Sequence, residues 1–316
     1  KNGRNFEYFG EDPWLAGEMA VQFTRGVQSQ GVVATVKHYV ANNRETERDT
    51  VSSDVDERAL REIYFPAFER AVKEADVGAV MTSYNLVNGT YASHHHELIE
   101  GVLRREWGFS GLVMSDWAAV HETKPAFLAG LDLEMPAGTF FNRQTLLPLL
   151  ERGEITASGI DDKVRHILRV LVRTGLIPAE DASAQKPELD DADSSRVALR
   201  AAERSLVLLE NRGVLPLDVK QVKKLAVIGP NAHPAVTGGS GSAYVTPFHA
   251  VSVLDGITAA APGVEVVHHP GLARPSSTAL LAKSCFSGEV KRQVFAGTKF
   301  EGAPIEERSV DRVDYR

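Results

Sequence analysis

The first 175 residues alternate segments of helical apolar spacing with short apolar runs that are rich in β-branched residues. Apolar positions at i, i+3, i+4 and i+7 predict four helices, over residues 13–30, 56–75, 97–105 and 160–175. The short apolar runs predict four strands, at residues 32–36, 77–82, 111–115 and 131–135. Strands that alternate with helices are typical of parallel βα units, so the sequence predicts an α/β layer.

Particular residues define the ends and faces of these helices. Asp12 is suited to the N-cap of the first helix and Pro13 to its first turn. The apolar stripe of this helix consists of Leu15, Met19 and Phe23. We expect the second helix to kink or restart at Pro66, because proline cannot continue a helix without distortion. The last helix is amphipathic through Ile160, Val164, Ile167, Leu168, Leu171 and Val172.

Composition divides the chain into four expected parts, residues 1–177, 178–197, 198–284 and 285–316. The second part is polar, acidic and without periodicity, which is typical of a linker. In the third part, a helix near 197–211 and strands at 224–230 and 264–267 indicate the beginning of a second α/β domain. The fourth part has short mixed apolar and charged pieces, at 290–295 and 313–315, as at the start of an all-β module.

The composition excludes several classes of partner. Both signs of charge are mixed along the chain, with a net charge of −7, so there is no basic surface for nucleic acid or an anionic membrane. No apolar run approaches the roughly 18 to 20 residues of a membrane span. The single cysteine, Cys285, excludes an internal disulfide and a thiolate metal cluster. We therefore expect a soluble segment with neutral small-molecule partners, and no nucleic-acid or membrane partner.

Polar side chains stand at the carboxyl ends of all four predicted strands. They are Lys37-His38, Tyr84-Asn85, Asp116-Trp117 and Glu134. In a parallel barrel all strand carboxyl ends meet on one face, so these groups are expected to converge on a single pocket.

Asp116 is the sharpest candidate, because it follows a largely apolar strand and precedes an aromatic ring, Trp117, that is suited to stacking on a sugar. A retaining glycosidase needs such a carboxylate to attack an anomeric carbon. The alternative from spacing alone is that Asp116 caps the following helix. Lys37 and His38 could donate hydrogen bonds to sugar hydroxyls and keep a nearby carboxylate ionised. The alternative for this pair is a solvated lysine and a buried, satisfied histidine.

Three other clusters have simpler interpretations. The run His94-His95-His96 has no i, i+4 zinc spacing, so no metal is expected, and no cofactor motif is present. The loop at 238–243 matches no phosphate-binding motif and is interpreted as a tight turn that could approach the sugar or the barrel. The charged residues Arg44, Glu45, Glu47, Arg48 and Asp49 are interpreted as ion pairs of a loop near the barrel mouth rather than as substrate contacts.

Several stretches occur together: Gly3-Arg4-Asn5-Phe6-Glu7, Lys37-His38-Tyr39, Met81-Thr82-Ser83-Tyr84-Asn85, Trp107-Gly108-Phe109, Met114-Ser115-Asp116-Trp117, Leu131-Asp132-Leu133-Glu134-Met135-Pro136 and Ile228-Gly229-Pro230-Asn231-Ala232. This set resembles glycoside hydrolase family 3, of the β-glucosidase kind, through most of residues 1–270. The resemblance implies an incomplete (β/α)8 TIM-type barrel followed by the first part of an α/β sandwich domain. It also implies a retaining, exo-acting β-glucosidase that takes β-glucosides or oligosaccharides as substrates.

The resemblance assigns roles to six residues. It implies that Asp116 is the nucleophile, that the subsite of the non-reducing glucose is lined by Arg4, Lys37, His38 and Tyr84, and that Trp117 forms part of the wall. N-acetylglucosaminidase-type relatives resemble Pro-Gly-His-Gly where this chain has Val40-Ala41-Asn42-Asn43. We therefore expect the acid/base to be a glutamate of the second domain.

Two departures from the family pattern affect what is expected of this chain. A family barrel begins before Lys1, and the first residues carry neither an initiator Met nor a signal-peptide profile, so the chain reads as a fragment whose localisation and oligomeric state stay open. The tail from about 285 resembles the beginning of a PA14 module, which would place the acid/base beyond Arg316. The alternatives are a β-xylosidase or other glycosidase of the same family, or a non-catalytic sugar-binding protein.

Overall fold

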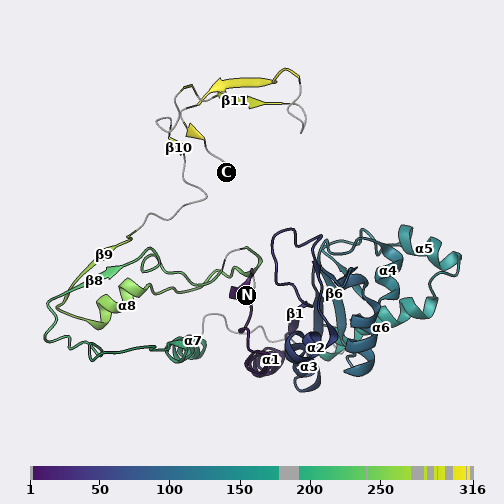
Figure 1. The fold of residues 1–316 in the computed structure, drawn as a ribbon, viewed down its shortest axis with the longest axis horizontal. Helices are drawn as coiled ribbons and strands as arrows, with labels where there is room; N and C mark the ends of the chain where they lie inside the picture. Colours follow the sequence, from purple (N-terminus) through teal and green to yellow (C-terminus); the bar gives the residue numbers. More distant parts are fainter. Residues whose placement is uncertain are drawn as a thin grey trace. The chain divides into compact units, whose positions relative to one another are not determined.

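The computed structural model describes residues 3–177, 192–239, 241–271, 281–282, 288–289, 291–295, 302–310 and 312–313. It divides into two compact units (Figure 1). The first unit is Lys1–Glu188 together with Gly239–Ala243, and the second is Leu189–Gly238 together with Tyr244–Arg316. The linker expected at 178–197 lies outside the described residues as far as residue 191.

The first unit is built on a four-stranded parallel sheet. In spatial order its strands are β1 (Thr35–Tyr39), β3 (Ala79–Thr82), β6 (Leu112–Trp117) and β7 (Leu133–Met135). All four predicted strands are present, and each pairs in parallel with the strand that follows it in this order. The α/β prediction is therefore confirmed, and the spatial order of the four strands is the same as their order in the chain.

Two of these strands extend further toward their carboxyl ends than the apolar runs predicted. β1 includes Lys37 and His38, and β6 includes Asp116 and Trp117. Polar residues can continue a strand because the ladder hydrogen bonds use the backbone, whatever the side chain is. Both ladders also shift register near these ends. The candidate residues are consequently held by the sheet and not by the loops that follow it.

Helices connect the strands. They are α1 (Pro13–Gln28), α2 (Glu57–Ala59), η2 (Leu60–Tyr64), α3 (Pro66–Lys73), η4 (Glu97–Glu106), α4 (Thr123–Leu128), α5 (Arg143–Glu151) and α6 (Ala157–Arg173). The Asp12 side chain accepts a hydrogen bond from Leu15 N, so the predicted N-cap is present. The second predicted helix restarts at Pro66, as expected. The sequence pattern missed α4 and α5, which are short and carry proline inside them.

Small elements surround the carboxyl ends of the strands. They are η1 (Asn5–Glu7), the strands β2 (Ser52–Ser53), β4 (Leu86–Val87) and β5 (Thr90–Tyr91), and the 3-10 turn η3 (Ala92–His94). β2, β4 and β5 form a separate three-stranded sheet. Of these elements, η1 carries Glu7, whose side chain pairs with Arg4 and Lys37.

The core of the first unit lies between the sheet and helices η2, α3 and η4. Tyr39 at the end of β1 is fully buried, and its ring packs against Phe65, Phe68 and Trp107 at centroid distances of 5.2 to 6.1 Å. The Tyr39 hydroxyl donates to Leu98 O, so this buried hydroxyl has a partner. Such aromatic contacts bury large apolar area and hold β1 rigidly, next to His38.

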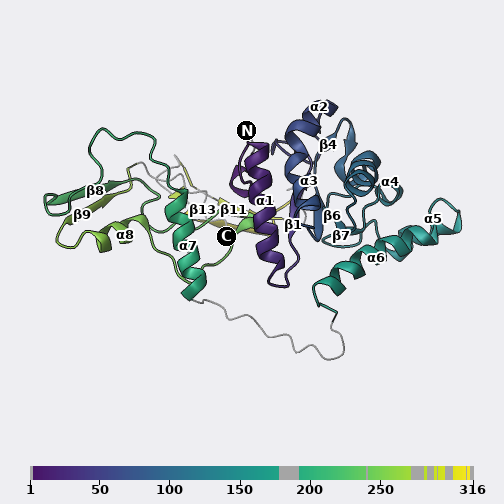
Figure 2. The same ribbon diagram turned by 90° about the horizontal axis from the view of Figure 1, so that it is seen from below.

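Two predicted apolar stripes are exposed in the first unit, which differs from the usual core-facing position of such a stripe. α1 lies beside α3 (Figure 2). The buried residues of α1 form its small face, Gly17, Ala20, Val21 and Thr24. Leu15, Met19 and Phe23 of α1 are about half exposed. On α6, Ile167 and Val170 pack against the sheet, whereas Val164, Leu168 and Val172 remain exposed. Apolar spacing alone does not predict which face of a helix packs against another element.

The second unit contains a parallel pair, β8 (Lys224–Ile228) and β9 (Glu265–His269), with α8 (Val253–Ala260) between them in sequence. Both strands were predicted. The predicted helix is present but lies earlier than expected, as α7 (Ala192–Ser205), because Asp193 and the serines that suggested a linker are well tolerated in the first turn of a helix. Residues 192–197 of the expected linker segment are therefore helical.

The last part of the chain contains only strands among its described residues. β11 (Lys291–Val294) pairs with β12 (Glu306–Ser309), and β10 (Leu281–Ala282) pairs with β13 (Arg312–Val313), both antiparallel. The strand pieces expected at 290–295 and near 313 are thus present. None of the described helices, in either unit, is long and apolar enough to cross a bilayer.

Candidate active site

Asp116 lies at the carboxyl end of β6, and only 7% of its surface is exposed. Its Oδ1 accepts a hydrogen bond of 2.7 Å from the backbone N–H of Trp117. Its Oδ2 is buried and, within the described parts of the chain, meets no donor in good hydrogen-bond geometry, although His38 Nε2 lies 3.3 Å away. Asp116 therefore has one oxygen oriented by the backbone and the other buried near His38.

His38 reaches Asp116 from β1, which is separated from β6 in the sheet by β3. Its side chain is almost completely buried, and its Nδ1 lies 2.8 Å from the hydroxyl of Tyr8. Burial, and then the positive charges of Lys37 and Arg4, lower the pKa of His38 to about 3. A neutral ring whose Nδ1 accepts from Tyr8 carries its proton on Nε2, toward Asp116.

His38 therefore adds no positive charge beside the carboxylate, because its lowered pKa leaves the ring neutral over the ordinary pH range. The two alternatives considered for His38 are also not exclusive. It is buried and hydrogen-bonded, as in the simpler interpretation, and it lies beside Asp116, as in the functional one.

Arg4 and Lys37 bring the positive charge. Arg4 Nε donates to Glu7 Oε1 at 3.1 Å, and Lys37 Nζ lies 3.7 Å from Glu7 Oε2. Burial acts to lower the pKa of Arg4, but the hydrogen bond and charge of Glu7 outweigh it and raise that pKa, with a smaller contribution from the charge of Asp116. Both side chains thus border the site, and Glu7 holds them together.

Tyr84 follows β3 and completes the group around Asp116. Burial first, and then the negative charge of Asp116, raise the pKa of Tyr84 to about 12, so its hydroxyl stays protonated and can donate. The guanidinium of Arg48 lies over the Tyr84 ring at 4.3 Å and also pairs with Glu45 at 3.0 Å. The ion pair expected in that loop is present, but Arg48 reaches the site as well.

Trp117 and Glu134 behave differently from each other. Trp117 directly follows Asp116, and half of its surface is exposed, so its ring is available as a wall. Glu134 was expected to converge on the same pocket. Instead its Oε2 accepts hydrogen bonds from the backbone N–H groups of Phe140 and Phe141, at 2.8 and 2.7 Å. Glu134 therefore orders the loop after β7 and is a structural carboxylate.

The structure brings together Arg4, His38 and Tyr84 around Asp116, with Lys37 joined to the group through Glu7. Sequence reasoning missed Glu7, Tyr8, Arg48 and Ser242, whose Oγ accepts from Arg4 Nη2 at 3.0 Å. The expectation that the loop at 238–243 approaches the barrel agrees with that contact. Tyr8 and Ser242 had no local signal, because their partners lie about 30 and 240 residues away in the chain.

The three adjacent histidines point to separate partners. His94 Nε2 accepts from the backbone N–H of His121, His95 Nδ1 accepts from Leu98 N, and His96 Nδ1 lies 2.9 Å from Leu128 O. Within the described ranges, no group of three or more His, Cys, Asp or Glu residues is arranged to hold a metal ion.

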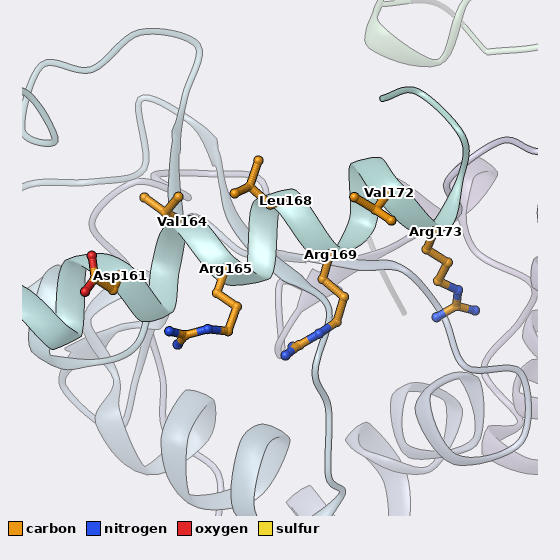
Figure 3. Close-up of a pocket in the computed structure, with 7 residues that line it drawn as sticks. All are labelled: Asp161, Val164, Arg165, Leu168, Arg169, Val172 and Arg173. Atoms are coloured by element: carbon orange, nitrogen blue, oxygen red, sulfur yellow. The ribbon is translucent and has the colours of Figure 1, made fainter. Parts of the chain in front are cut away.

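A separate hollow lies away from these residues, on the first unit. It has a volume of about 600 Å³ and runs along the exposed side of α6, between Asp161 and Arg173 (Figure 3). Figure 3 shows apolar Val164, Leu168 and Val172 along one side of the helix and three arginines along another. A single helix face with no converging polar groups lacks the features of a reaction site. The candidate active site is therefore the group of side chains around Asp116 and not this hollow.

The fold and the site together place the chain in a general class of α/β proteins. In this class, functional side chains gather at the carboxyl ends of parallel strands. Within that class, the chain belongs to glycosyl hydrolase family 3. The model of the family's N-terminal domain matches residues 1–170, and the model of its C-terminal domain matches residues 206–311.

Similar proteins carry related names. A β-glucosidase of Rhizobium radiobacter is 44% identical over 314 residues, which is 99% of this chain and 38% of that protein. The crystal structure of a GH3 β-glucosidase from Bifidobacterium adolescentis has a TM-score of 0.76 at 40% identity, over 86% of this chain and 39% of that one. The structure of β-glucosidase 3B from Thermotoga neapolitana in complex with glucose has a TM-score of 0.76 at 42% identity, over 84% and 37%. The chain thus spans less than half the length of these relatives.

Proposed function

We propose that the protein is a retaining, exo-acting β-glucosidase in which Asp116 is the nucleophile. The observation that carries this proposal is the Asp116 carboxylate itself, which is held at a strand end with one buried oxygen, Oδ2, not engaged by a hydrogen bond of good geometry. The family and the names of the relatives support a glycoside hydrolase that acts on β-glucosides. Neutral β-glucosides or oligosaccharides are the proposed substrates.

In the first step, Asp116 Oδ2 forms a bond to the anomeric carbon, and the bond from that carbon to the glycosidic oxygen breaks. The leaving oxygen takes a proton from a second carboxyl and departs as an alcohol. In the second step, the same group, now a carboxylate, takes a proton from water, whose oxygen displaces Asp116 and releases glucose. The two inversions together retain the configuration.

The other site residues have binding roles in this proposal. Arg4 and Lys37 donate to sugar hydroxyls as fixed cations, while neutral His38 and protonated Tyr84 donate without adding charge. Trp117 forms part of the wall against which the apolar face of a sugar ring stacks. None of these binding roles requires a metal or a cofactor.

The second carboxyl is proposed to be a glutamate from outside residues 1–316. No other carboxylate oxygen has a recorded contact with Asp116 in the described structure, and Glu134 is occupied by backbone N–H groups. With it we propose the division of the chain into part of a (β/α)8 barrel (1–177), a linker (178–197), the first part of an α/β sandwich domain (198–284) and the start of a PA14-like module (285–316). The antiparallel strand pairs near the end of the chain support the last of these.

Trapping the covalent intermediate tests the role of Asp116. The intact protein is treated with an activated 2-fluoroglucoside, whose fluorine slows the second step, and the labelled peptide is identified by mass spectrometry. We expect the adduct on Asp116, no adduct in Asp116→Asn, and a fall in kcat of at least about a thousandfold in that variant. Glu134→Gln is the matched control, because it changes another buried carboxylate at a strand end.

Label on another residue would contradict the assignment of Asp116. A protein that binds glucosides, forms no adduct and turns over no glucoside would instead favour the sugar-binding alternative.

A further inference from the structure

Residues 118–122 follow Asp116 and Trp117 and lead into α4, and we call them the 118–122 loop. The loop begins with a sharp reversal, because Ala118 has a φ of 58°. Its backbone is tied to the sheet by Ala118 N, which donates to Met135 O at 2.8 Å, and by Ala119 N, which donates to Asp116 O at 3.2 Å. The position of the loop therefore bears directly on the residues just before it.

A second element holds the far side of this loop. The buried Ser93 hydroxyl of η3 donates to Ala119 O at 2.5 Å. His94, the next residue, accepts a hydrogen bond at 3.2 Å from the backbone N–H of His121 through Nε2. Two adjacent side chains thus bind one backbone acceptor and one backbone donor, two residues apart, and we call this pair the Ser93–His94 clamp.

Ring stacking strengthens the clamp. The His121 ring lies on the Tyr91 ring at a centroid distance of 3.9 Å, and His94 packs against the edge of Tyr91 at 5.6 Å. Burial, and then the neighbouring His121, lower the pKa of His94 to about 4, so the ring is neutral and its Nε2 can accept. A protonated ring would have no acceptor for the His121 N–H.

The clamp is also attached to the strand that carries Tyr84. Ala92 of η3 donates its N–H to Asn85 O, directly after Tyr84, at 3.1 Å. The side chains that meet at the site from β3 and from β6 are therefore connected by η3 and not only by the sheet. None of the clamp residues has a recorded contact with the Asp116 carboxylate, so any role in the reaction is indirect.

We propose that Ser93 and His94 are positioning residues that fix the 118–122 loop and, through it, the orientation of Trp117 beside Asp116. This inference rests on the proposed function, because it assigns Trp117 and Asp116 to one substrate site. A loop held at only one end would let the Trp117 ring sample several orientations. Misplacement of a substrate-contacting group by about 1 Å can cost on the order of a hundredfold in rate.

Fluorine NMR of the intact protein labelled with 5-fluorotryptophan tests the clamp without depending on activity. Trp117→Phe assigns the Trp117 signal, and the buried Trp107 serves as an internal reference for the fold. His94→Leu removes the acceptor, Ser93→Ala removes the donor with a minimal change of volume, and His94→Gln restores an acceptor that does not titrate. His96→Leu is the matched control, since His96 also bonds one backbone atom, Leu128 O, but not in this loop.

We expect His94→Leu and Ser93→Ala to shift or broaden the Trp117 signal while the Trp107 signal stays in place. His94→Gln should return the Trp117 signal toward wild type, and His96→Leu should leave it unchanged. On an aryl β-glucoside, His94→Leu should lower kcat/KM about tenfold or more, with partial recovery in His94→Gln.

A Trp117 shift in either His94→Leu or Ser93→Ala that is absent from His96→Leu supports the clamp, and Ser93→Ala decides if His94→Leu does not fold. Trp117 signals that coincide with wild type in every folded clamp variant, or that move equally in His96→Leu, overturn it. If the intact protein hydrolyses no β-glucoside, the proposed function fails, and the fluorine signals still decide the clamp.

Discussion

Glu7 stands between the two cations that border the candidate nucleophile. Its side chain is almost completely buried and pairs with both Arg4 and Lys37. The two cations are thus paired with Glu7, whereas Asp116 Oδ2 has no hydrogen bond of good geometry in the described structure. In the proposed mechanism this matters because ion pairs and hydrogen bonds stabilise a carboxylate and so make it a weaker nucleophile.

The neutral state of His38 predicts how stability depends on pH. Its pKa is about 3 when folded and near 6.5 when unfolded, so between these values the unfolded chain binds a proton that the folded chain does not. This contribution is complete above about pH 6.5 and is lost as the pH falls toward 3, at a slope of up to about 1.4 kcal/mol per pH unit. Urea unfolding at pH 7, 6 and 5, followed by tryptophan fluorescence, measures it.

The comparison is made with His38→Gln, which keeps an N–H donor but cannot titrate in this range. We expect the free energy of unfolding to fall more steeply with acid in wild type than in this variant, whatever the carboxylates contribute to both. Parallel pH dependences in the two proteins would show that His38 titrates normally when folded.

At the scale of elements, Asp132 joins three of them. Its Oδ2 accepts from Arg104 of η4 at 2.6 Å and from the backbone of Val113 in β6 at 2.7 Å, and its Oδ1 lies 2.8 Å from His166 Nδ1 of α6. The Asp132 side chain is 1% exposed and that of Arg104 is 8% exposed. This buried network fixes the two helices against β6, the strand that carries Asp116.

We expect Asp132→Ala to lower the free energy of unfolding by about 3 to 5 kcal/mol, because it leaves the buried Arg104 charge without its partner. Urea denaturation of the intact protein measures the loss. Asp162→Ala is the matched control, since Asp162 pairs with Arg165 on the surface of α6, where both side chains are more than half exposed. Its effect should stay below about 1 kcal/mol. Equal effects of the two substitutions would show that the Asp132 network contributes no more to the free energy of unfolding than a surface ion pair does.

At the scale of the whole molecule, the regions matched by the two family models can be compared with the two compact units of the structure. The family models meet residues 1–170 and 206–311, and the first unit ends at Glu188 before it resumes at Gly239–Ala243. A short piece from far along the sequence, including Ser242, thus belongs to the unit that carries Asp116. Site residues of this family member are therefore distributed along the chain more widely than the strand ends alone suggest.

If the acid/base lies outside residues 1–316, these residues alone should hydrolyse a β-glucoside of a poor leaving group about 10²- to 10⁴-fold more slowly than the intact protein. The deficit should shrink for an aryl glucoside whose leaving group needs no proton, and added azide, a nucleophile that needs no base, should raise turnover of that substrate. Steady-state rates on the two substrates, with and without azide, measure both effects. Brisk hydrolysis of the poor substrate by residues 1–316 would mean that the acid/base is within them.

Local pattern was sufficient for the elements of the sheet and for the candidate nucleophile. Apolar spacing, helix caps and proline positions are properties of neighbouring residues. The four strands, the Asp12 cap and the restart at Pro66 can therefore be predicted from the sequence. That polar groups follow successive parallel strands also suggested that Asp116, His38 and Tyr84 would meet, and the structure brings them together.

Only the tertiary structure decided what each polar group does there. His38 is neutral because other segments bury it, Glu134 is occupied by a loop that follows it, and Glu7 and Tyr8 reach the site from a distant part of the chain. Which face of α1 or α6 is buried likewise depends on a partner that periodicity does not name. Burial, pairing and hence protonation arise from contacts between segments far apart in sequence, and a linear pattern carries no record of those contacts.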